Sequence, residues 1–293
     1  MEDSVYIALA GIFGLLVGSF LNVVIHRLPQ MMEQGWAQEC AEYAKQSHTP
    51  DCACSSSPAT SAPTLTLSQP RSRCPHCGHQ IRWFENIPVF SYLALRGKCA
   101  GCKTSISIRY PLVEIATACL FAFSIAQWGF NATGAAWCLF AAALVSLALI
   151  DWDTTLLPDS ITLPLVWAGL IASALQWTPV ELKDAIWGAV AGYLSLWSVY
   201  WGFKLLTGKE GMGYGDFKLL AALGAWFGWQ ALIPIILISS VIGAIVGTVM
   251  KMSKKLREGG YIPFGPFLAG AGFVVMVFGK DTVMRSLFAF TGT

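Results

Sequence analysis

Apolar residues along this 293-residue chain are grouped into long runs rather than into short alternating patterns. A helix needs roughly 20 apolar residues to cross a hydrocarbon layer of about 30 Å. The runs are separated by Gly, Pro, Asn or charged residues, which are typical of turns. They cover residues 5–25, 111–129, 134–150, 160–177, 185–206, 217–229, 231–250 and 261–279. This pattern predicts an all-α polytopic membrane protein with about eight transmembrane helices, of which 217–229 is the shortest.

The composition agrees with lipid as the main surroundings of the chain. Only 12% of the residues are charged, whereas a soluble domain has about 25%. This excludes an ordinary soluble globule. The net charge of +2 gives no reason to expect a nucleic-acid partner, so we expect the lipid bilayer and no nucleic acid.

The basic residues predict the orientation of the spans. Nine of the 19 Lys and Arg residues lie from Arg27 to Arg109, and none lies from Tyr110 to Leu182. Basic residues accumulate in the cytoplasmic loops of membrane proteins. If residues 27–109 are cytoplasmic, alternation of the spans places 16 of the 19 bases on that side. Both termini are therefore expected on the opposite, non-cytoplasmic side of the membrane.

The first span is expected to be an anchor rather than a secretory signal. A signal peptide carries its basic residues before the apolar run, whereas Arg27 comes after it. The chain then divides into a first transmembrane helix (1–26), a cytoplasmic insert (27–109) and a seven-helix membrane domain (110–293).

The insert contains a loose segment and two cysteine pairs. Residues 30–70 contain few large apolar residues. This segment is therefore expected to lack a core and to be partly disordered. Cys74-x2-Cys77 and Cys99-x2-Cys102 follow. This spacing predicts a small zinc-ribbon-like domain, with Gly78 and Gly101 relieving the tight turns. Two disulfides are the alternative, disfavoured in a reducing cytoplasm.

A four-cysteine site does not require the nearby histidines or the other cysteines of the chain. His76 and His79 are possible substitute ligands, although they are expected to face solvent. Cys40, Cys52 and Cys54 lie in the loose segment and need no role. Cys119 and Cys138 lie in spans and are expected to be small apolar space-filling residues.

Acidic residues occupy two cytoplasmic loops where basic residues would be expected. Asp151, Asp153 and Asp159 follow the third span, and Asp216 ends Gly213-Tyr214-Gly215-Asp216. Ionisable groups at the membrane edge are candidates for function. Asp159 is best interpreted as a helix N-cap, and Asp216 could be one too. Asp151 could equally be a solvated helix end.

Taken together, Asp151 and Asp216 predict acid–base chemistry. Both lie on the same membrane face, at junctions between an apolar helix and a loop. Two neighbouring carboxyls cannot both ionise cheaply, so one keeps a proton while the other is anionic. Such a pair can hydrolyse a peptide through an activated water. A phosphate-binding loop is a weak alternative, because Gly213-Tyr214-Gly215 lacks the Lys-Ser/Thr of that motif.

The sequence resembles the bacterial type IV prepilin peptidases, which belong with the Gly-x-Gly-Asp intramembrane aspartyl proteases. The resemblance rests on several motifs in the family's order: Gly18-Ser19-Phe20-Leu21-Asn22, Arg27-Leu28-Pro29, Arg73-Cys74-Pro75-His76-Cys77, Glu85-Asn86-Ile87-Pro88, Arg96-Gly97-Lys98-Cys99, Tyr110-Pro111-Leu112-Val113-Glu114, Asp151 to Asp159, Gly213-Tyr214-Gly215-Asp216 and Pro263-Phe264-Gly265-Pro266.

The resemblance implies a bifunctional enzyme of the bacterial inner membrane. Asp151 and Asp216 would be catalytic, and Cys74, Cys77, Cys99 and Cys102 would bind structural zinc. The enzyme would cleave the short basic leader of prepilins and pseudopilins after Gly, at the cytoplasmic face. It would then methylate the new amino terminus with S-adenosylmethionine, in support of type IV pilus or type II secretion assembly.

The methyltransferase residues are less well defined. The family associates methylation with the cysteine domain and with the residues that match Gly97 and Lys98, although Lys98 could equally be a positive-inside anchor. Glu114 could support either site or pair with Arg109. Two other classes of protein stay open: a proton-coupled transporter, which would place its acids near the bilayer midplane, and a zinc-ribbon scaffold without chemistry. The sequence does not give the oligomeric state.

Overall fold

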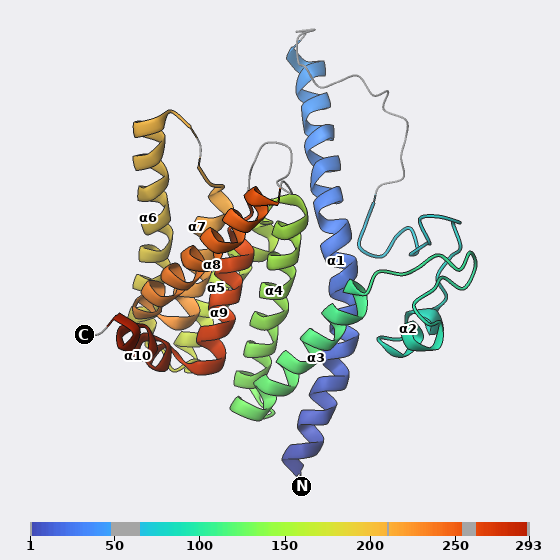
Figure 1. Cartoon of the computed structure of the whole chain (residues 1–293), viewed down its shortest axis with the longest axis horizontal. Coiled ribbons are helices and arrows are strands. Elements are labelled where there is room, and N and C mark those ends of the chain that lie inside the picture. Colours follow the sequence, from blue (N-terminus) through green and yellow to red (C-terminus); the bar gives the residue numbers. More distant parts are fainter. Residues whose placement is uncertain (1, 48–64, 210, 254–261, 292–293) are drawn as a thin grey trace. The chain divides into compact units, whose positions relative to one another are not determined.

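A computed structural model describes residues 2–47, 65–209, 211–253 and 262–291 of the chain (Figure 1). Helices dominate this part of the chain, and its only β pairing consists of two isolated bridges, Arg73 with Gln80 and Lys98 with Ser105. The segment 48–64, which includes Cys52 and Cys54, lies outside the described residues. The chain divides into two compact units, Leu15–Ala116 and the remainder, Met1–Gly14 with Thr117–Thr293.

Helix α1 (Glu2–Ser47) is much longer than the first apolar run. It continues through Pro29, so residues 30–47 are helical, which corrects the expectation that the segment after residue 30 is loose. Their side chains are mostly exposed. They therefore have no core, as expected, but Met, Glu, Gln, Ala and Lys are strong helix formers that need none to favour a helix.

The unit Leu15–Ala116 joins the second part of α1 to the first turns of α3 (Arg109–Trp128) through a compact polar region. That region contains the four-cysteine loops, a short 3₁₀ helix η1 (Trp83–Asn86) and the short helix α2 (Phe90–Ala94). Arg27 on α1 donates hydrogen bonds to the carbonyls of Thr66 (2.9 Å) and Pro70 (2.7 Å). This contact ties the beginning of the polar region to α1.

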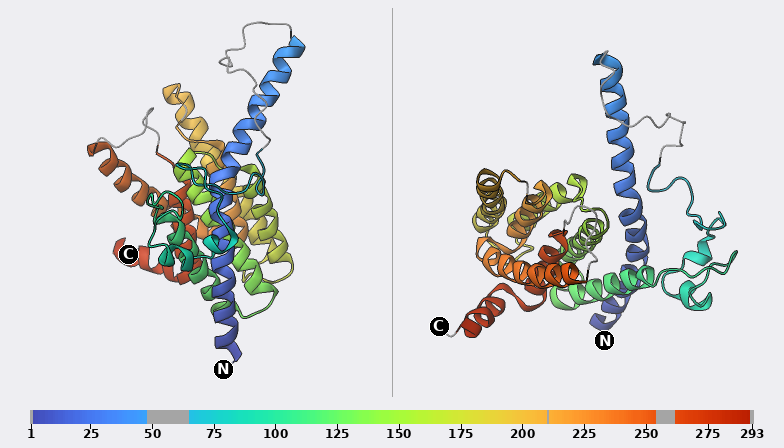
Figure 2. Two further views of the ribbon diagram at one scale, coloured as in Figure 1. Left: turned by 90° about the vertical axis from the view of Figure 1, so that its right-hand side faces the viewer. Right: turned by 45° about the horizontal axis from the view of Figure 1, so that its top comes forward.

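The other unit is a helical bundle around α7 (Tyr214–Phe227), seen from further directions in Figure 2. Its other helices are α4 (Ala132–Thr154), α5 (Asp159–Ala174), α6 (Leu182–Thr207), the short η2 (Trp229–Ala231), α8 (Leu232–Met252), α9 (Gly265–Phe278) and α10 (Lys280–Thr291). Helix α7 packs against α5, α6 and α9 and is buried along most of its length. The short apolar run at 217–229 is therefore the centre of this bundle.

Four described helices are long and apolar enough to cross a membrane, namely residues 3–44, α3, α4 and η2 with α8. Helices α9 and α10 form a possible fifth span, bent by 108°. This establishes a helical protein with several apolar spans. Length and mean hydropathy do not give the predicted count of eight spans, because α5 and α7 are short and the many Gly, Ser, Trp and Tyr residues of α6 lower its mean hydropathy.

Candidate active site and metal centre

Asp151 lies in the last turn of α4 and is only 4% exposed. Its carboxylate Oδ2 accepts a hydrogen bond from the backbone N–H of Gly265, at 2.9 Å. Gly265 is the first residue of α9, where backbone N–H groups have no partner within the helix. The carboxylate thus occupies a place where helix geometry favours negative charge.

Asp216 is the third residue of α7 and is 6% exposed. The N-cap of this helix is Gly213, so the alternative that Asp216 caps the helix is wrong. Among the described residues, no donor forms a hydrogen bond with its buried Oδ1. A buried carboxyl oxygen without a partner is costly for stability, and such atoms are candidates for a catalytic role.

The structure brings Asp151 and Asp216 to one place through Leu157. A Cβ on Gly215 would lie 2.6 Å from Cβ of Leu157, and a Cβ on Gly265 would lie 3.3 Å from Leu157 Cδ1. The negative charge of Asp151 also acts directly on the Asp216 carboxyl. Gly215 therefore allows the close backbone approach expected of the Gly-x-Gly sequence, whereas a Cβ on Gly213 would meet only the Gly215 backbone N, at 4.0 Å.

The remaining acids of the loop after α4 have other surroundings. Asp153 is exposed, as its two-residue spacing from Asp151 predicts. Asp159 is not the N-cap of α5, which corrects our expectation; Pro158 holds that position. The Asp159 carboxylate instead forms an ion pair with Lys218 Nζ, at 2.6 Å. This pair joins the start of α5 to α7, two residues beyond Asp216.

A group of polar aromatic side chains near Asp216 was not predicted from the sequence. Tyr214, inside the Gly-x-Gly-Asp sequence, lies 3.5 Å from the buried Tyr200 hydroxyl. Lys204 Nζ donates to the same Tyr200 hydroxyl at 3.2 Å. These contacts fasten the start of α7 to α6. The only signal in the sequence was the Tyr within the motif.

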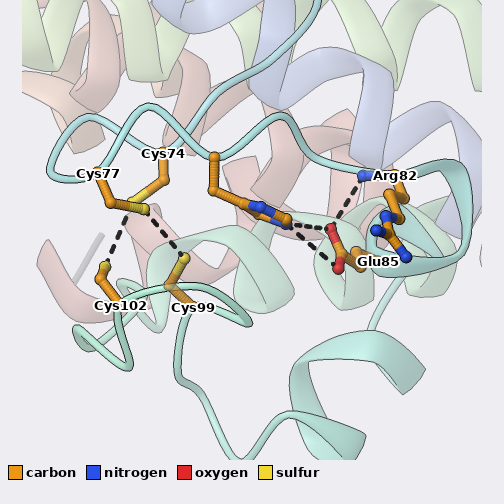
Figure 3. Close-up of polar contacts among 7 residues, drawn as sticks. Cys74, Cys77, Arg82, Glu85, Cys99 and Cys102 are labelled. Atoms are coloured by element: carbon orange, nitrogen blue, oxygen red, sulfur yellow. Dashed lines mark hydrogen bonds and ion pairs between the residues drawn. The ribbon is translucent and has the colours of Figure 1, made fainter.

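The four predicted cysteines come together in a cluster that could hold a metal ion (Figure 3). Their sulfur atoms all lie within 4.8 Å of one another. Cys74 and Cys102 are 3.8 Å apart at sulfur, and Cys77 and Cys99 are 4.0 Å apart. Tetrahedral zinc with Zn–S bonds of about 2.3 Å needs sulfurs about 3.8 Å apart. The donor set and its spacing therefore fit zinc.

Each cysteine loop has a residue with positive φ directly after its second cysteine, but this residue is a glycine in the first loop only. Gly78 has φ +69°, and the equivalent position after Cys102 is Lys103, with φ +60°. Gly101 does not relieve the second turn, which corrects our expectation. It permits close packing instead, because a Cβ there would lie 3.4 Å from Cys77 Sγ and 3.2 Å from His79 Cβ.

Polar groups near Cys102 favour its thiolate, and a contact between His79 and Glu85 holds the first loop in place. The hydroxyl and backbone N–H of Thr104 lower the pKa of Cys102 to about 6, and thiolate is the form that binds metal. His79 Nε2 lies 3.1 Å from a Glu85 carboxylate oxygen. The backbone N–H of Arg82 and the His79 ring hold the pKa of Glu85 below its ordinary value. His79 is thus engaged by Glu85, and His76 is exposed.

Of the other described cysteines, Cys138 is buried within the bundle, as expected of a space-filling residue. Cys40 and Cys119 are exposed.

Gly97 and Lys98 come directly before the third cysteine. Gly97 has φ +66°, and a Cβ there would lie 2.9 Å from the Tyr92 hydroxyl, so α2 packs closely on this turn. The Lys98 side chain is exposed. Glu114 on α3 is buried, and its carboxylate accepts the backbone N–H of Val89 at 2.8 Å. Glu114 therefore fixes the loop that leads into α2.

Known families match both parts of the chain. Residues 12–128 match the family described as Bacterial Peptidase A24 N-terminal domain, and residues 138–248 match the Type IV leader peptidase family. No solved structure matches the chain.

Curated relatives match nearly the whole chain. A prepilin leader peptidase/N-methyltransferase of Stutzerimonas stutzeri is 53% identical, over 97% of this chain and 94% of its own length. Proteins with the same description from Pseudomonas aeruginosa and Aeromonas hydrophila are 52% and 50% identical, each over 96% of this chain and 93% of its own length.

Proposed function

Because the chain belongs to the type IV leader peptidase family, we propose that it is a prepilin leader peptidase and N-methyltransferase. It removes the short basic leader of prepilins and pseudopilins after a Gly, and then methylates the new amino terminus with S-adenosylmethionine. The observation that carries the proteolytic half is the meeting of two buried carboxyls, Asp151 and Asp216, beside Leu157.

The hydrogen bonds suggest different roles for the two acids in cleavage. Asp151 accepts the Gly265 N–H and is suited to carry the negative charge. Within the described part of the chain, Oδ1 of Asp216 has no hydrogen-bond donor, and the charge of Asp151 acts on this carboxyl, so Asp216 is suited to hold the shared proton. The anionic carboxylate then deprotonates the attacking water, while the protonated one polarises the scissile carbonyl.

We place this reaction at the cytoplasmic face of the inner membrane. The chain would cross the membrane eight times, using α1 and α3 to α9, with both termini outside. The bias of Lys and Arg toward one side supports this orientation. It would present Asp151 and Asp216 where a basic leader in the cytoplasm joins an apolar helix in the bilayer.

We assign structural zinc to Cys74, Cys77, Cys99 and Cys102. Sulfur spacings of 3.8 and 4.0 Å support this assignment. The metal would cross-link two loops that share no regular sheet. For methylation, S-adenosylmethionine supplies the methyl group, and Gly97 and Lys98 would bind S-adenosylmethionine. The exposed Lys98 ammonium could meet the carboxylate of this substrate.

Intact-mass analysis of a prepilin incubated with the purified full-length protein and S-adenosylmethionine tests this function. The expected product has lost its leader and gained one methyl group. Asp151→Asn and Asp216→Asn should each leave the substrate uncleaved while zinc content and thermal unfolding stay close to those of the wild type. Asp153→Asn, an exposed acid near the same site, serves as the matched control and should cleave normally. Full cleavage by both single variants would remove the assignment.

A further inference from the structure

The polar region before α3 exposes an unusual number of large apolar side chains. Trp83 is 82% exposed, Phe90 67% and Leu93 65%. We call the following set the apolar face: Trp83, Phe84, Ile87, Phe90, Leu93 and Ile108. It comes from η1, α2 and the residue just before α3 begins. All six lie between residues 83 and 108, and large exposed apolar residues gathered in one polar region indicate a surface that contacts something apolar.

Two hydrogen bonds fix the level of this region along the spans. Val89, the N-cap of α2, donates its N–H to Glu114 at 2.8 Å. Glu114 lies five residues after Arg109, where α3 begins, which is about 7.5 Å along a helix axis. Asn22 on α1 donates to the Tyr110 carbonyl at 3.2 Å, which places the inner end of the first apolar run level with the start of α3. Helix α2 is therefore held beside the first turns of α3 (Figure 1).

The charge of the region complements a membrane surface. Residues 65–109 contain seven Lys and Arg residues but a single acid, Glu85. Aromatic residues combined with basic ones are typical of segments that lie in the headgroup layer of an anionic bilayer. One residue of the apolar face, Ile108, directly precedes α3.

We propose that the apolar face is embedded in the headgroup layer of the membrane that α3 crosses, with α2 as an interfacial helix. The proposal rests on the proposed function only in taking α3 as a membrane span. Glu114 acts as the anchor that sets the depth of α2. The turn of Gly97 and Lys98, packed on Tyr92 of α2, is then held at the membrane surface. An amino terminus released from an apolar helix would emerge at that surface.

Site-specific photo-crosslinking in vesicles of phosphatidylethanolamine and phosphatidylglycerol tests the proposal. A diazirine amino acid replaces Phe90 or Leu93 in the full-length protein. Cys119 is the lipid-facing control, because it is exposed ten residues into α3. Cys40 is the water-facing control, because it is exposed on α1, 13 residues beyond Arg27 or about 20 Å along the helix.

The proposal is supported if lipid adducts form at positions 90, 93 and 119 and do not form at position 40. Adducts at Phe90 and Leu93 with other parts of the protein or with water only, while Cys119 still labels lipid, overturn it and leave the proposed function standing. If Cys119 fails to label lipid, α3 is not a span, and the membrane assignment fails along with this proposal.

Discussion

The backbone N–H of Gly265 contacts one of the two candidate catalytic carboxylates, that of Asp151. Gly265 has no side chain, and a Cβ there would lie 2.6 Å from Asp151 Oδ2 and 3.1 Å from its Cγ. Any side chain at this position must therefore displace Asp151. The glycine is required by the carboxylate rather than by backbone conformation.

We expect Gly265→Ala to reduce prepilin cleavage by about 10²-fold, the usual effect of misplacing a catalytic group by about 1 Å. Gly270→Ala on the same helix is the matched control, since a Cβ there meets nothing within 4 Å. Initial rates of leader removal, measured beside thermal unfolding, separate a site effect from loss of fold. Equal cleavage rates for the two variants would show that the Asp151–Gly265 contact is dispensable.

A substitution at Gly78 tests the backbone conformation of the first cysteine loop. Gly78 has φ +69° and open space around it, so an added methyl group would strain only the backbone. Gly78→Ala should destabilise the loop by about 1–2 kcal/mol, the cost of a left-handed conformation. Release of zinc to a chelator should then be roughly 10-fold faster. Gly35→Ala, in open space on α1, should release zinc at the wild-type rate, and a similar acceleration in both variants would contradict this explanation.

At the scale of single residues, the sequence predicts acids and cysteines better than their partners. Asp151, Asp216 and the four cysteines stand out because charge is costly near lipid and because Cys-x2-Cys spacing is specific. The Gly265 contact could not be predicted, since a backbone N–H 114 residues from Asp151 carries no side-chain signal. Likewise, the sequence does not predict that Lys103, rather than a glycine, has the positive φ in the second loop.

At the scale of elements, small residues determine how closely α6 and α7 approach. A Cβ on Gly188 of α6 would collide with the Gly224 carbonyl of α7, and a Cβ on Gly224 with the Gly188 carbonyl. Such contacts are typical of helices packed in membranes, where close backbone approach replaces the hydrophobic effect. Because Asp216 and Gly224 both lie on α7, this contact also helps to position the candidate active site.

Gly188→Ala should separate α6 from α7 and destabilise the bundle by about 1–3 kcal/mol, the usual cost of overpacking. Gly202→Ala on the same helix is its control, because a Cβ there meets nothing within 4 Å. Thermal unfolding in detergent would show a lower midpoint for Gly188→Ala alone, accompanied by slower cleavage. An unchanged midpoint for Gly188→Ala would mean that the two helices can move apart without loss.

Apolar runs locate the helices of this protein well but their ends poorly. The runs correspond to α1 and α3 to α9, because long apolar segments have few alternatives to a helix in lipid. The apolar runs do not predict the ends of helices where residues outside the run also favour a helix. Helix α1 continues to Ser47 on the strength of residues with high helix propensity. Helix α7 begins at Tyr214, inside the glycine motif, because Gly213 provides the cap.

For the whole molecule, the division into two units separates the two proposed chemistries. The four cysteines, Gly97 and Lys98 belong to Leu15–Ala116, whereas both candidate catalytic acids belong to the other unit. The acids are held by contacts with Leu157, Gly215 and Gly265, all of the same unit. Nothing in these contacts requires the metal.

Loss of zinc should therefore separate methylation from cleavage. Metal binding supplies folding free energy to a small region, and few apolar side chains are buried among its described residues. Cys74→Ser should abolish zinc binding and methylation while most of the leader-peptidase activity remains. Cys40→Ser, at an exposed cysteine outside the cluster, should retain both activities and the metal. Product masses report the two activities in one assay, because leader removal and methyl addition change the mass independently. If Cys74→Ser stopped cleavage as completely as methylation, the cysteine unit would have to support the aspartyl site directly, and the two chemistries would not be separable.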